Sequence, residues 1–271
     1  MDYLARTTSP ISETLWAQID EAVVGVARNV LTGRRFLTLT GPLGPGAATI
    51  QIDDAETRQE TLEDGFVINK GRRIVEIPTL FEDFQLLARD LTQSEADGRA
   101  ADLTPVLRAA QAAALREDRM IFFGNPTLGL EGLTNAAGAN RMARSDWSTG
   151  ENAFADVAAA IDTLVQNGVY GTYTLVLSPS LHTQLQRLQP GTGLLELDRV
   201  SRLVGGHLFK SPVLGKNQAV LLCAQPENVD LVVGQDLAAA YLEQRDLNHH
   251  FRLLESALVR VRRPAAITVL E

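Results

Sequence analysis

The stretch from residue 103 to residue 133, LTPVLRAAQAAALREDRMIFFGNPTLGLEGL, constrains the fold more than any other part of the chain. Thr104 and Pro105 are a typical helix beginning, because a proline at the first position gives up only a backbone donor that has no partner there. Apolar residues then recur at helical spacing while alanines occupy other faces, so the helix can pack on more than one side. Gly124, followed by asparagine and proline, predicts the helix end. The pattern indicates one long, deeply set helix.

A second helix is predicted near the N-terminus, where Ser12 can cap the first turn and Glu13 suits the positive helix end. Its apolar stripe continues at helical spacing to Val30. The rest of the chain mixes both periods, and so predicts an α+β protein. Further helices are expected at 152–167, 179–188 and 194–204, and strands at 36–39, 173–177, 208–210, 219–223, 229–233, 251–261 and 267–270.

Residues 51–79 differ from their surroundings in charge. Between residues 53 and 64 there are six acidic side chains and one arginine, a local charge of -5. The sequence Asn-Lys-Gly at 69–71 predicts a turn between two strand-like runs, which makes the segment a hairpin arm with Lys70, Arg72 and Arg73 at its tip. Because an isolated hairpin is marginally stable in water, the arm is expected to rest on another surface. The alternative is a solvated charged loop without a partner.

Composition excludes several classes of protein. At 271 residues the chain can form one large or two smaller domains, and 45% hydrophobic and 21% charged residues are ordinary for a globular protein. No apolar run reaches about 18 residues, and the N-terminus lacks the basic and apolar segments of a secretory signal. We therefore expect no membrane partner and a cytoplasmic location. The net charge of -8 argues against sequence-independent binding of nucleic acid.

Metal and thiol chemistry find little support in the sequence. His249 and His250 are adjacent on an expected strand and so point to opposite faces. The chain has neither an HExxH motif nor the cysteine spacing of a zinc site, and we predict no metal and no cofactor. The single Cys223 lies in an apolar run and is expected to be a small buried hydrophobe.

Hydrolytic chemistry is equally unsupported. Glu117 and Asp118 stand between two arginines, so ion pairing accounts for them better than paired acid and base roles do. Ser178 and His182 are one helical turn apart, but the G-x-S-x-G elbow of serine hydrolases is missing. We predict no catalytic residue.

Two motifs and many scattered matches give the chain a family resemblance. E-D-x-x-I-F-x-G occupies 117–124 and G-L-x-G-L occupies 129–133. Other matching residues are Pro10, Trp16, Ile19, Asp20, Gly33, Arg34, Arg35, Phe36, Gly41, Pro42, Gly171, Tyr173, Leu175, Val176, Leu177, Gly234, Gln235, Asp236, Leu237, Pro264 and Ala266. With these residues the chain resembles the encapsulins, bacterial shell proteins that share the Hong Kong 97-like major capsid fold of tailed phages.

The resemblance implies a division of the chain. A discontinuous P-domain would comprise 1–50, 80–145 and 225–271, with the terminal strand tied into it. The E-loop arm would be 51–79, and the A-domain would be 146–224. The A-domain clusters at the symmetry axes of encapsulin shells, and the arm reaches over a neighbouring subunit.

The resemblance also implies sites. A pocket on the inner face of the shell receives a short targeting tail of a cargo protein, and its expected residues here are Val23, Val26, Val30, Leu31, Arg34, Asp236 and Leu237. The loop nearest the fivefold pore would be Leu188, Gln189, Pro190, Gly191 and Thr192. On the arm, Lys70, Arg72 and Arg73 would help to set the register between subunits, a role that suits complementary charge.

The implied function is a container. Many identical copies would form a closed icosahedral homo-oligomer that admits small solutes and encloses a ferritin-like iron oxidase or a dye-decolourising peroxidase, for iron storage or oxidative-stress defence. The flavin of one relative is not implied, because Leu87 stands where its stacking tryptophan would be. The alternatives are a phage major capsid protein and, with less support, a peptidase or bacteriocin.

Overall fold

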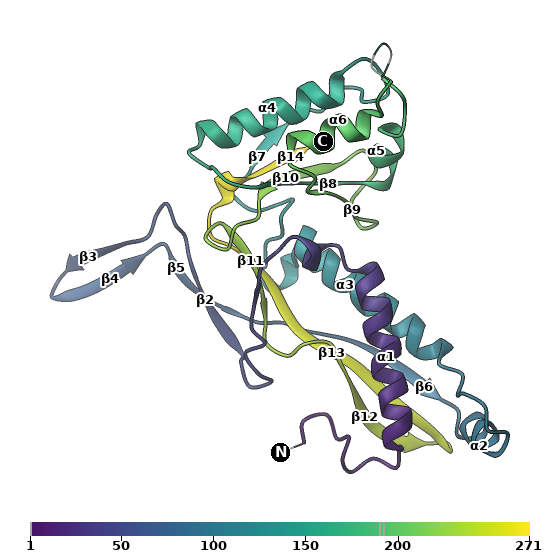
Figure 1. Cartoon of the computed structure of the whole chain (residues 1–271). Coiled ribbons are helices and arrows are strands. Elements are labelled where there is room, and N and C mark those ends of the chain that lie inside the picture. The colour runs from purple at the N-terminus through teal and green to yellow at the C-terminus, as the bar shows by residue number, and fades with distance from the viewer. Residues whose placement is uncertain (1, 190, 192) are drawn as a thin grey trace.

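In the computed structural model, which describes residues 2–189, 191 and 193–271, the chain forms two units built on sheets and one projecting arm (Figure 1). The larger unit is elongated, and the long helices α1 (Glu13–Val30) and α3 (Thr104–Phe123) lie along its sheet. Short helices occur elsewhere, at α2 Ala88–Ala96, η1 Gly33–Arg35, η2 Pro126–Leu128 and η3 Pro264–Ala266. The mixture of helix and sheet predicted from the sequence is confirmed.

The first sheet is organised by one long strand, β13. Strands β12 and β6 pair with its first part, β11 pairs with its second part, and β1 pairs with β11 at the edge. The bounds are β1 Leu39–Thr40, β6 Thr79–Leu86, β11 Val229–Val233, β12 Ala238–Arg245 and β13 Asn248–Val261. The strand expected at 36–39 is thus displaced, because residues 33–35 form a helical turn and pairing begins only at Leu39.

The two long helices form where the sequence predicts them. The Ser12 hydroxyl accepts a hydrogen bond from the Leu15 N–H, and α3 ends at Gly124, as expected. At its other end α3 begins with Thr104 as the first helical residue and Leu103 in the cap position, and the Asp102 carboxylate accepts from the Thr104 N–H. The core beneath α1 is aromatic, with the Trp16 ring edge-on to Phe251 at a centroid distance of 5.6 Å.

The second sheet has the order β7-β14-β10-β8-β9. Its strands are β7 Asn140–Met142, β8 Tyr173–Leu177, β9 Leu208–Lys210, β10 Ala219–Cys223 and β14 Ile267–Leu270. The helices of this unit, drawn over the sheet in Figure 1, are α4 Asn152–Gln166, α5 Pro179–Gln184 and α6 Glu196–Leu203. The expectation that the terminal strand joins the first domain is wrong, because β14 lies between β10 and β7 in this second sheet.

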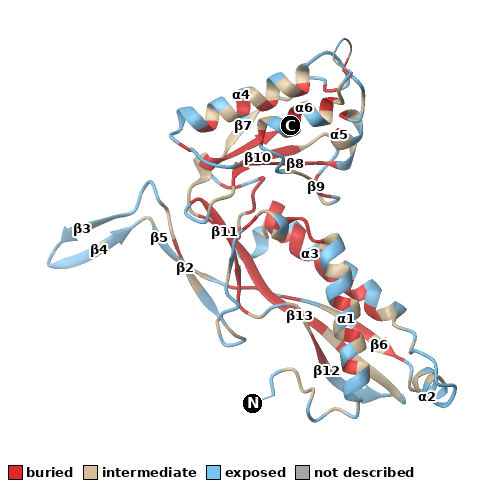
Figure 2. Ribbon diagram, viewed as in Figure 1, coloured by how far each residue is buried: buried red, intermediate tan, exposed pale blue. Residues whose placement is uncertain are grey.

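Both faces of the second sheet are covered, which explains its uninterrupted apolar strands. In β10, Leu221 and its alternate neighbours pack under the helices, whereas Val220 and Leu222 face a core shared with α3 and the first sheet. The same alternation places Leu270 in one core and Val269 in the other. Figure 2 shows the resulting band of buried residues through this sheet.

The arm consists of two successive ribbons. Strand β2 (Thr49–Asp53) pairs with β5 (Arg72–Glu76), and β3 (Gln59–Glu63) pairs with β4 (Phe66–Lys70). Figure 2 shows the outer ribbon as almost entirely exposed. The segment that contains these four strands therefore projects from the body as a hairpin arm.

The predicted turn of the arm is wrong. The tip is Asp64 and Gly65, with φ of 50° and 82°, the left-handed conformations that a two-residue hairpin turn requires. In the Asn-Lys-Gly sequence the first two residues end β4, and Gly71 alone joins it to β5, which pairs with a different partner strand. At Gly71 an added Cβ would lie 2.6 Å from the Arg58 nitrogen, so this crossing requires glycine. The cations expected at the tip consequently lie further back along the arm.

Candidate functional site

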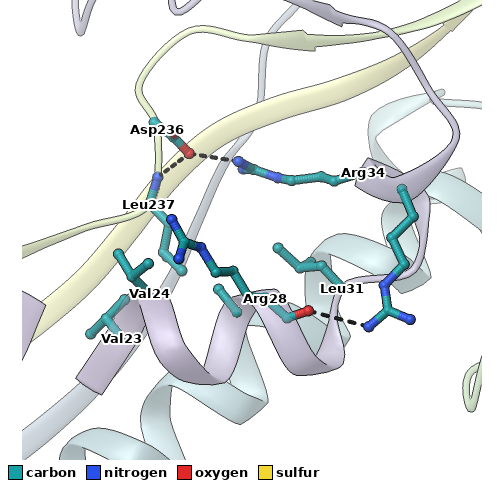
Figure 3. Close-up of a pocket in the computed structure, with 9 residues that line it drawn as sticks. Val23, Val24, Arg28, Leu31, Arg34, Asp236 and Leu237 are labelled. Carbon is teal, nitrogen blue, oxygen red and sulfur yellow. Dashed lines mark hydrogen bonds and ion pairs between the residues drawn. The ribbon is translucent and has the colours of Figure 1, made fainter. Parts of the chain in front are cut away.

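A groove of about 370 Å³ runs along the second half of α1. The helix presents residues spaced by about one turn, and the segment between β11 and β12 supplies the opposite wall (Figure 3). The lining residues are Val23, Val24, Ala27, Arg28, Leu31, Arg34, Arg35, Asp236 and Leu237. The floor is therefore mainly apolar, and guanidinium groups and one carboxylate surround it.

Arg34 joins the groove to a buried cluster of carboxylates. Its Nε donates to Glu117 Oε1 at 2.9 Å, its Nη1 donates to Asp236 Oδ1 at 2.8 Å, and its Nη2 donates to Glu255. The Glu117 and Glu255 side chains are 1% and 2% exposed. Guanidinium is suited to this place, because its planar fork can serve several carboxylates at once. The cluster fixes Arg34 and, through it, the wall at Asp236.

The cluster shifts the ionisation of its members. Burial raises the pKa of Glu255 well above its ordinary value, and the charge of Glu117 raises it further, while Arg34 acts in the opposite direction. Burial lowers the pKa of Arg34, but Glu117 and the other two carboxylates outweigh it, so that this pKa is raised. Arg34 therefore stays positively charged, and any proton that the cluster gains or loses is bound or released by one of its carboxylates.

The entry to the helical turn η1 depends on Asp118. Its carboxylate accepts hydrogen bonds from the Thr32 N–H at 2.9 Å and the Gly33 N–H at 2.9 Å. Burial raises the pKa of Asp118 to about 6, although the two backbone donors lower it. A Cβ at Gly33 would lie 2.4 Å from Ile121 Cδ1, so a larger residue here would have to displace the buried Ile121 side chain. Glu117 does form an ion pair, but its partner is Arg34 and not a flanking arginine, since Arg116 pairs with Glu82. Asp118 instead accepts hydrogen bonds from backbone N–H groups.

The structure brings together most of the residues expected in the pocket. Val23, Leu31, Arg34, Asp236 and Leu237 line the groove, whereas Val26 and Val30 do not. Val26 instead packs against the aromatic core under α1. The residues that the prediction missed are Val24, Ala27, Arg28 and Arg35. The first three could have been predicted from helical spacing, since residues 24, 27, 28 and 31 share one face of a helix.

The loop expected at the pore is anchored at its base. The Gln189 N–H donates to the Leu194 carbonyl at 2.9 Å, and Arg187 Nη2 donates to the Gly150 carbonyl at 2.7 Å. Leu188 is exposed and Gln189 is buried, and Gly191 has a φ of 80°. Pro190 and Thr192 lie outside the described residues.

The three cations expected at the arm tip pair with carboxylates of their own chain. Arg72 Nε lies 2.9 Å from Asp53 Oδ1, Arg73 Nη2 lies 3.6 Å from Glu131, and Lys70 Nζ lies 3.7 Å from Glu63. All three pairs are at least partly exposed. Two exposed apolar side chains, Leu62 and Phe66, lie nearer to the tip than these cations do.

Other candidate positions are structural. Ser178 is fully buried, and its hydroxyl accepts from the Leu181 N–H as the cap of α5. Cys223 is fully buried, and burial raises the pKa of its thiol. Within residues 2–189, 191 and 193–271, no group of three or more histidine, cysteine or acidic residues is arranged to hold a metal ion. None of the described helices is long and apolar enough to cross a membrane.

The solved structures with the same fold are capsids and related particles. The virus-like particle of Pyrococcus furiosus matches with a TM-score of 0.78 at 20% identity, covering 96% of this chain and all of that one. The holo-SrpI encapsulin complex of Synechococcus elongatus matches with a TM-score of 0.60 at 12% identity, covering 100% and 95% of the two chains. The capsid of a Myoviridae phage also matches, with a TM-score of 0.63 at 15% identity over 88% and 90%. The predicted capsid fold is confirmed.

Sequence comparison identifies the family. The family described as "Encapsulating protein for peroxidase" matches residues 1–258. The type 1 encapsulin shell protein EncA of Myxococcus xanthus is 35% identical over 280 residues, which cover all of this chain and 96% of the relative. A diheme-cytochrome-encapsulin shell fusion protein of Kuenenia stuttgartiensis is 35% identical over 96% of this chain and 74% of its own length. The chain therefore belongs to the encapsulin family of shell proteins.

Proposed function

We propose that identical copies of this chain assemble into a closed icosahedral container in the cytoplasm, and that the groove along α1 holds a short tail of a cargo enzyme. Membership of a family of shell proteins supports the container. The arm supports assembly, because it exposes Leu62, Phe66 and Ile74 to the extent of 81%, 72% and 76%. Exposed apolar area of this kind is typical of interaction sites.

Closure does not require strong individual contacts. Each subunit of a closed shell touches several neighbours, and the last contacts form at high effective concentration because the others already hold the subunit in place. In the proposed shell the arm lies over a neighbouring subunit. Lys70, Arg72 and Arg73 contribute register rather than affinity, since each already has a carboxylate partner.

The groove is the single observation that carries the proposal of cargo binding. Its apolar floor and its position beside the fixed cation Arg34 suit an extended peptide segment, which gains affinity when an oligomeric cargo presents several tails. A peroxidase is the cargo class that the family description favours. A ferritin-like iron oxidase is the second class, and the corresponding roles are oxidative-stress defence and iron storage. The container itself is proposed to be no enzyme.

Two experiments test this function. Electron microscopy of the protein expressed alone should show closed hollow particles, and a protein that stays monomeric at every concentration and salt would contradict the container.

For the groove, Val24→Asp places a carboxylate on the apolar floor, where burial against a peptide leaves the charge without a partner. Shells of this variant should form normally but retain less than about a tenth of the cargo co-purified from the native host. Val30→Asp is the matched control, because Val30 belongs to the same helix but does not line the groove. Equal loading by Val24→Asp and the unaltered protein would remove the groove from cargo binding.

A further inference from the structure

Three parts of the molecule meet at residues 260–263, at the end of the long strand β13. In Figure 1 this strand passes from the first sheet toward the second, and the arm contacts its end from the side. The backbone of the segment is fixed, because the N–H groups of Arg262 and Arg263 both donate to the Asn228 carbonyl, at 2.8 and 3.1 Å. A group that binds here is therefore held at a fixed point of the subunit.

The inner ribbon of the arm, formed by β2 and β5, is anchored by packing. Ile52 of β2 is buried and lies in an apolar cluster with Leu258 of β13. The Arg260 guanidinium, which forms a buried ion pair with Asp230, also donates to the Gln51 carbonyl at 3.4 Å. The position of the inner ribbon is thus set within its own subunit.

The outer ribbon, formed by β3 and β4, has no such anchor. Residues 59–63 and 66–70 are all described by the structure, and none of them is buried. An elbow, residues 54–58 and Gly71, joins the two ribbons. Local contacts shape it, since Asp54 Oδ1 accepts from the Glu56 N–H at 2.8 Å and the Asp54 N–H donates to the Gly71 carbonyl at 2.8 Å. The direction of the outer ribbon therefore depends on how the elbow is held against the body.

Apolar packing does not hold the elbow on one of its sides. A hollow of about 300 Å³ lies there, lined by Asp54 and Gly71 from the arm and by Pro264 from the body. At the border of the hollow, Arg73 Nη2 lies 3.6 Å from a carboxylate oxygen of Glu131. The elbow is consequently held by individual polar contacts.

Arg263 connects the elbow to the second unit. Its Nε donates to Glu56 Oε1 at 3.2 Å, its Nη1 donates to the Gly168 carbonyl at 3.3 Å, and its Nη2 donates to the Asn167 carbonyl at 2.6 Å. The two carbonyl groups directly follow α4, and the C-terminal end of a helix favours a cation. A guanidinium suits this place, because its planar set of donors can serve several acceptors at once.

A backbone contact lies beside this bridge, since the Ala55 N–H donates to the Arg262 carbonyl at 2.9 Å. From these contacts we infer that Arg263 holds the elbow, through Glu56, to the end of α4 and thereby sets the direction of the outer ribbon relative to the second unit. Arg263 and Glu56 are thus positioning residues of the arm. Their role rests on the proposed container, in which they give the arms of all copies the same direction.

A weak contact suffices for this role. The side chains of Arg263 and Glu56 are 27% and 47% exposed, so their pair favours the docked elbow by only about two- to fivefold in one subunit. A closed particle repeats the same contact in every copy, and the contributions of separate sites add. Loss of the contact should therefore alter the particles even where the folding of a single subunit scarcely changes.

The test compares the unaltered protein with Glu56→Gln, which removes the charge at the elbow and leaves Arg263 in place on α4. Hydrogen exchange, measured by mass spectrometry, follows the Ala55 amide, because its bond to the Arg262 carbonyl reports whether the elbow is docked. We expect this amide to exchange about two- to fivefold faster in the variant. Electron microscopy should show particles of one diameter for the unaltered protein and the loss of that single diameter in the variant. Unchanged exchange, or an unchanged single diameter, overturns the inference.

Further variants assign the effect to the contact itself. Arg263→Gln should also accelerate the exchange and remove the single diameter, and adding Glu56→Gln to it should change neither readout further, because both residues act through one contact. Arg141→Gln is the matched control. Arg141 likewise donates to one carboxylate, that of Glu271, and to one backbone carbonyl, but it lies on β7 in the second sheet. Additive effects of the two elbow substitutions, or the same effects in Arg141→Gln, overturn the inference.

The failure of this inference can be told from a failure of the proposed container. If the unaltered protein forms closed particles and Glu56→Gln leaves exchange and diameter unchanged, the container stands and only the role of Arg263 is wrong. If the unaltered protein forms no closed particles, the container is wrong, and the role of Arg263 in directing the arms falls with it.

Discussion

The second sheet and the arm place apolar side chains in opposite surroundings. All five residues of β10 are buried, and they alternate between a core under the helices and a core shared with the first sheet. In the outer ribbon of the arm, by contrast, Leu62, Phe66 and Val67 are 81%, 72% and 59% exposed. The sheet is completed by its own chain, whereas the outer ribbon of the arm is left exposed, and in the proposed shell a neighbouring subunit covers it. Apolar content alone therefore does not reveal whether the partner surface is internal.

The largest expected effect comes from the same substitution in both regions. Leu221→Ala in β10 should lower the free energy of unfolding by about 2–5 kcal/mol, because it removes buried methyl groups and leaves a cavity. Leu62→Ala in the arm should change it by less than about 0.5 kcal/mol, because that side chain is exposed. Chemical denaturation under conditions of equal assembly state measures both. Similar losses in the two variants would show that the arm folds against the body of its own subunit.

A change of pH should alter the stability of the body and of the arm in opposite directions. The pKa of Asp118 in the body rises from 3.8 to about 6, so its contribution to stability is present below pH 3.8 and is lost as the pH rises to about 6. The loss amounts to about 3 kcal/mol relative to Asp118→Asn, since one pKa unit corresponds to roughly 1.4 kcal/mol.

In the arm the sign is opposite. The hydrogen bond from Arg72 lowers the pKa of Asp53, so its contribution is present above pH 3.8 and is lost as the pH falls below that value. Denaturation of Asp118→Asn and Asp53→Asn between pH 3 and pH 7, each compared with the unaltered protein, measures the two trends. Trends of the same sign would contradict this assignment of the two carboxylates.

The smallest effect on the subunit should accompany the largest effect on assembly. Leu62 and Val67 are cross-strand partners on one face of the outer ribbon. Replacing both with serine should leave the free energy of unfolding of the subunit within about 0.5 kcal/mol, because both are exposed, yet closed particles should be lost. Light scattering and electron microscopy measure the particles. Normal shells from this double variant would exclude the arm face as an essential contact.

The sequence allowed most elements of the fold to be predicted, since helical and strand periodicity marks α1, α3, α4 and β8 within a residue or two. Two errors have physical causes. The Asp-Gly pair at 64–65 is the stronger turn signal, because both of its residues adopt positive φ, yet the prediction placed the turn at the Asn-Lys-Gly sequence. The partner of β14 is a matter of long-range pairing, on which local periodicity carries no information.

The groove was predicted only in part for a related reason. Family resemblance indicated Leu31, Arg34 and Leu237, which line it. Arg28 shares a helix face with Leu31 and could have been assigned from helical spacing, whereas Arg35 lies beyond the helix and could be assigned only when the fold placed it at the groove. Arg34 and Glu255 are far apart in the chain, and neither segment has a sequence pattern that predicts their ion pair.

The interior position of β14 bears on the order of events during synthesis. Until residues 267–270 have left the ribosome, β7 lacks its neighbour and one edge of β10 stays open. The unit built on the second sheet is thus incomplete in a nascent chain, and so are both cores to which β14 contributes. We therefore expect a nascent chain that stops short of residue 267 to assemble poorly, because this unit has not yet folded completely.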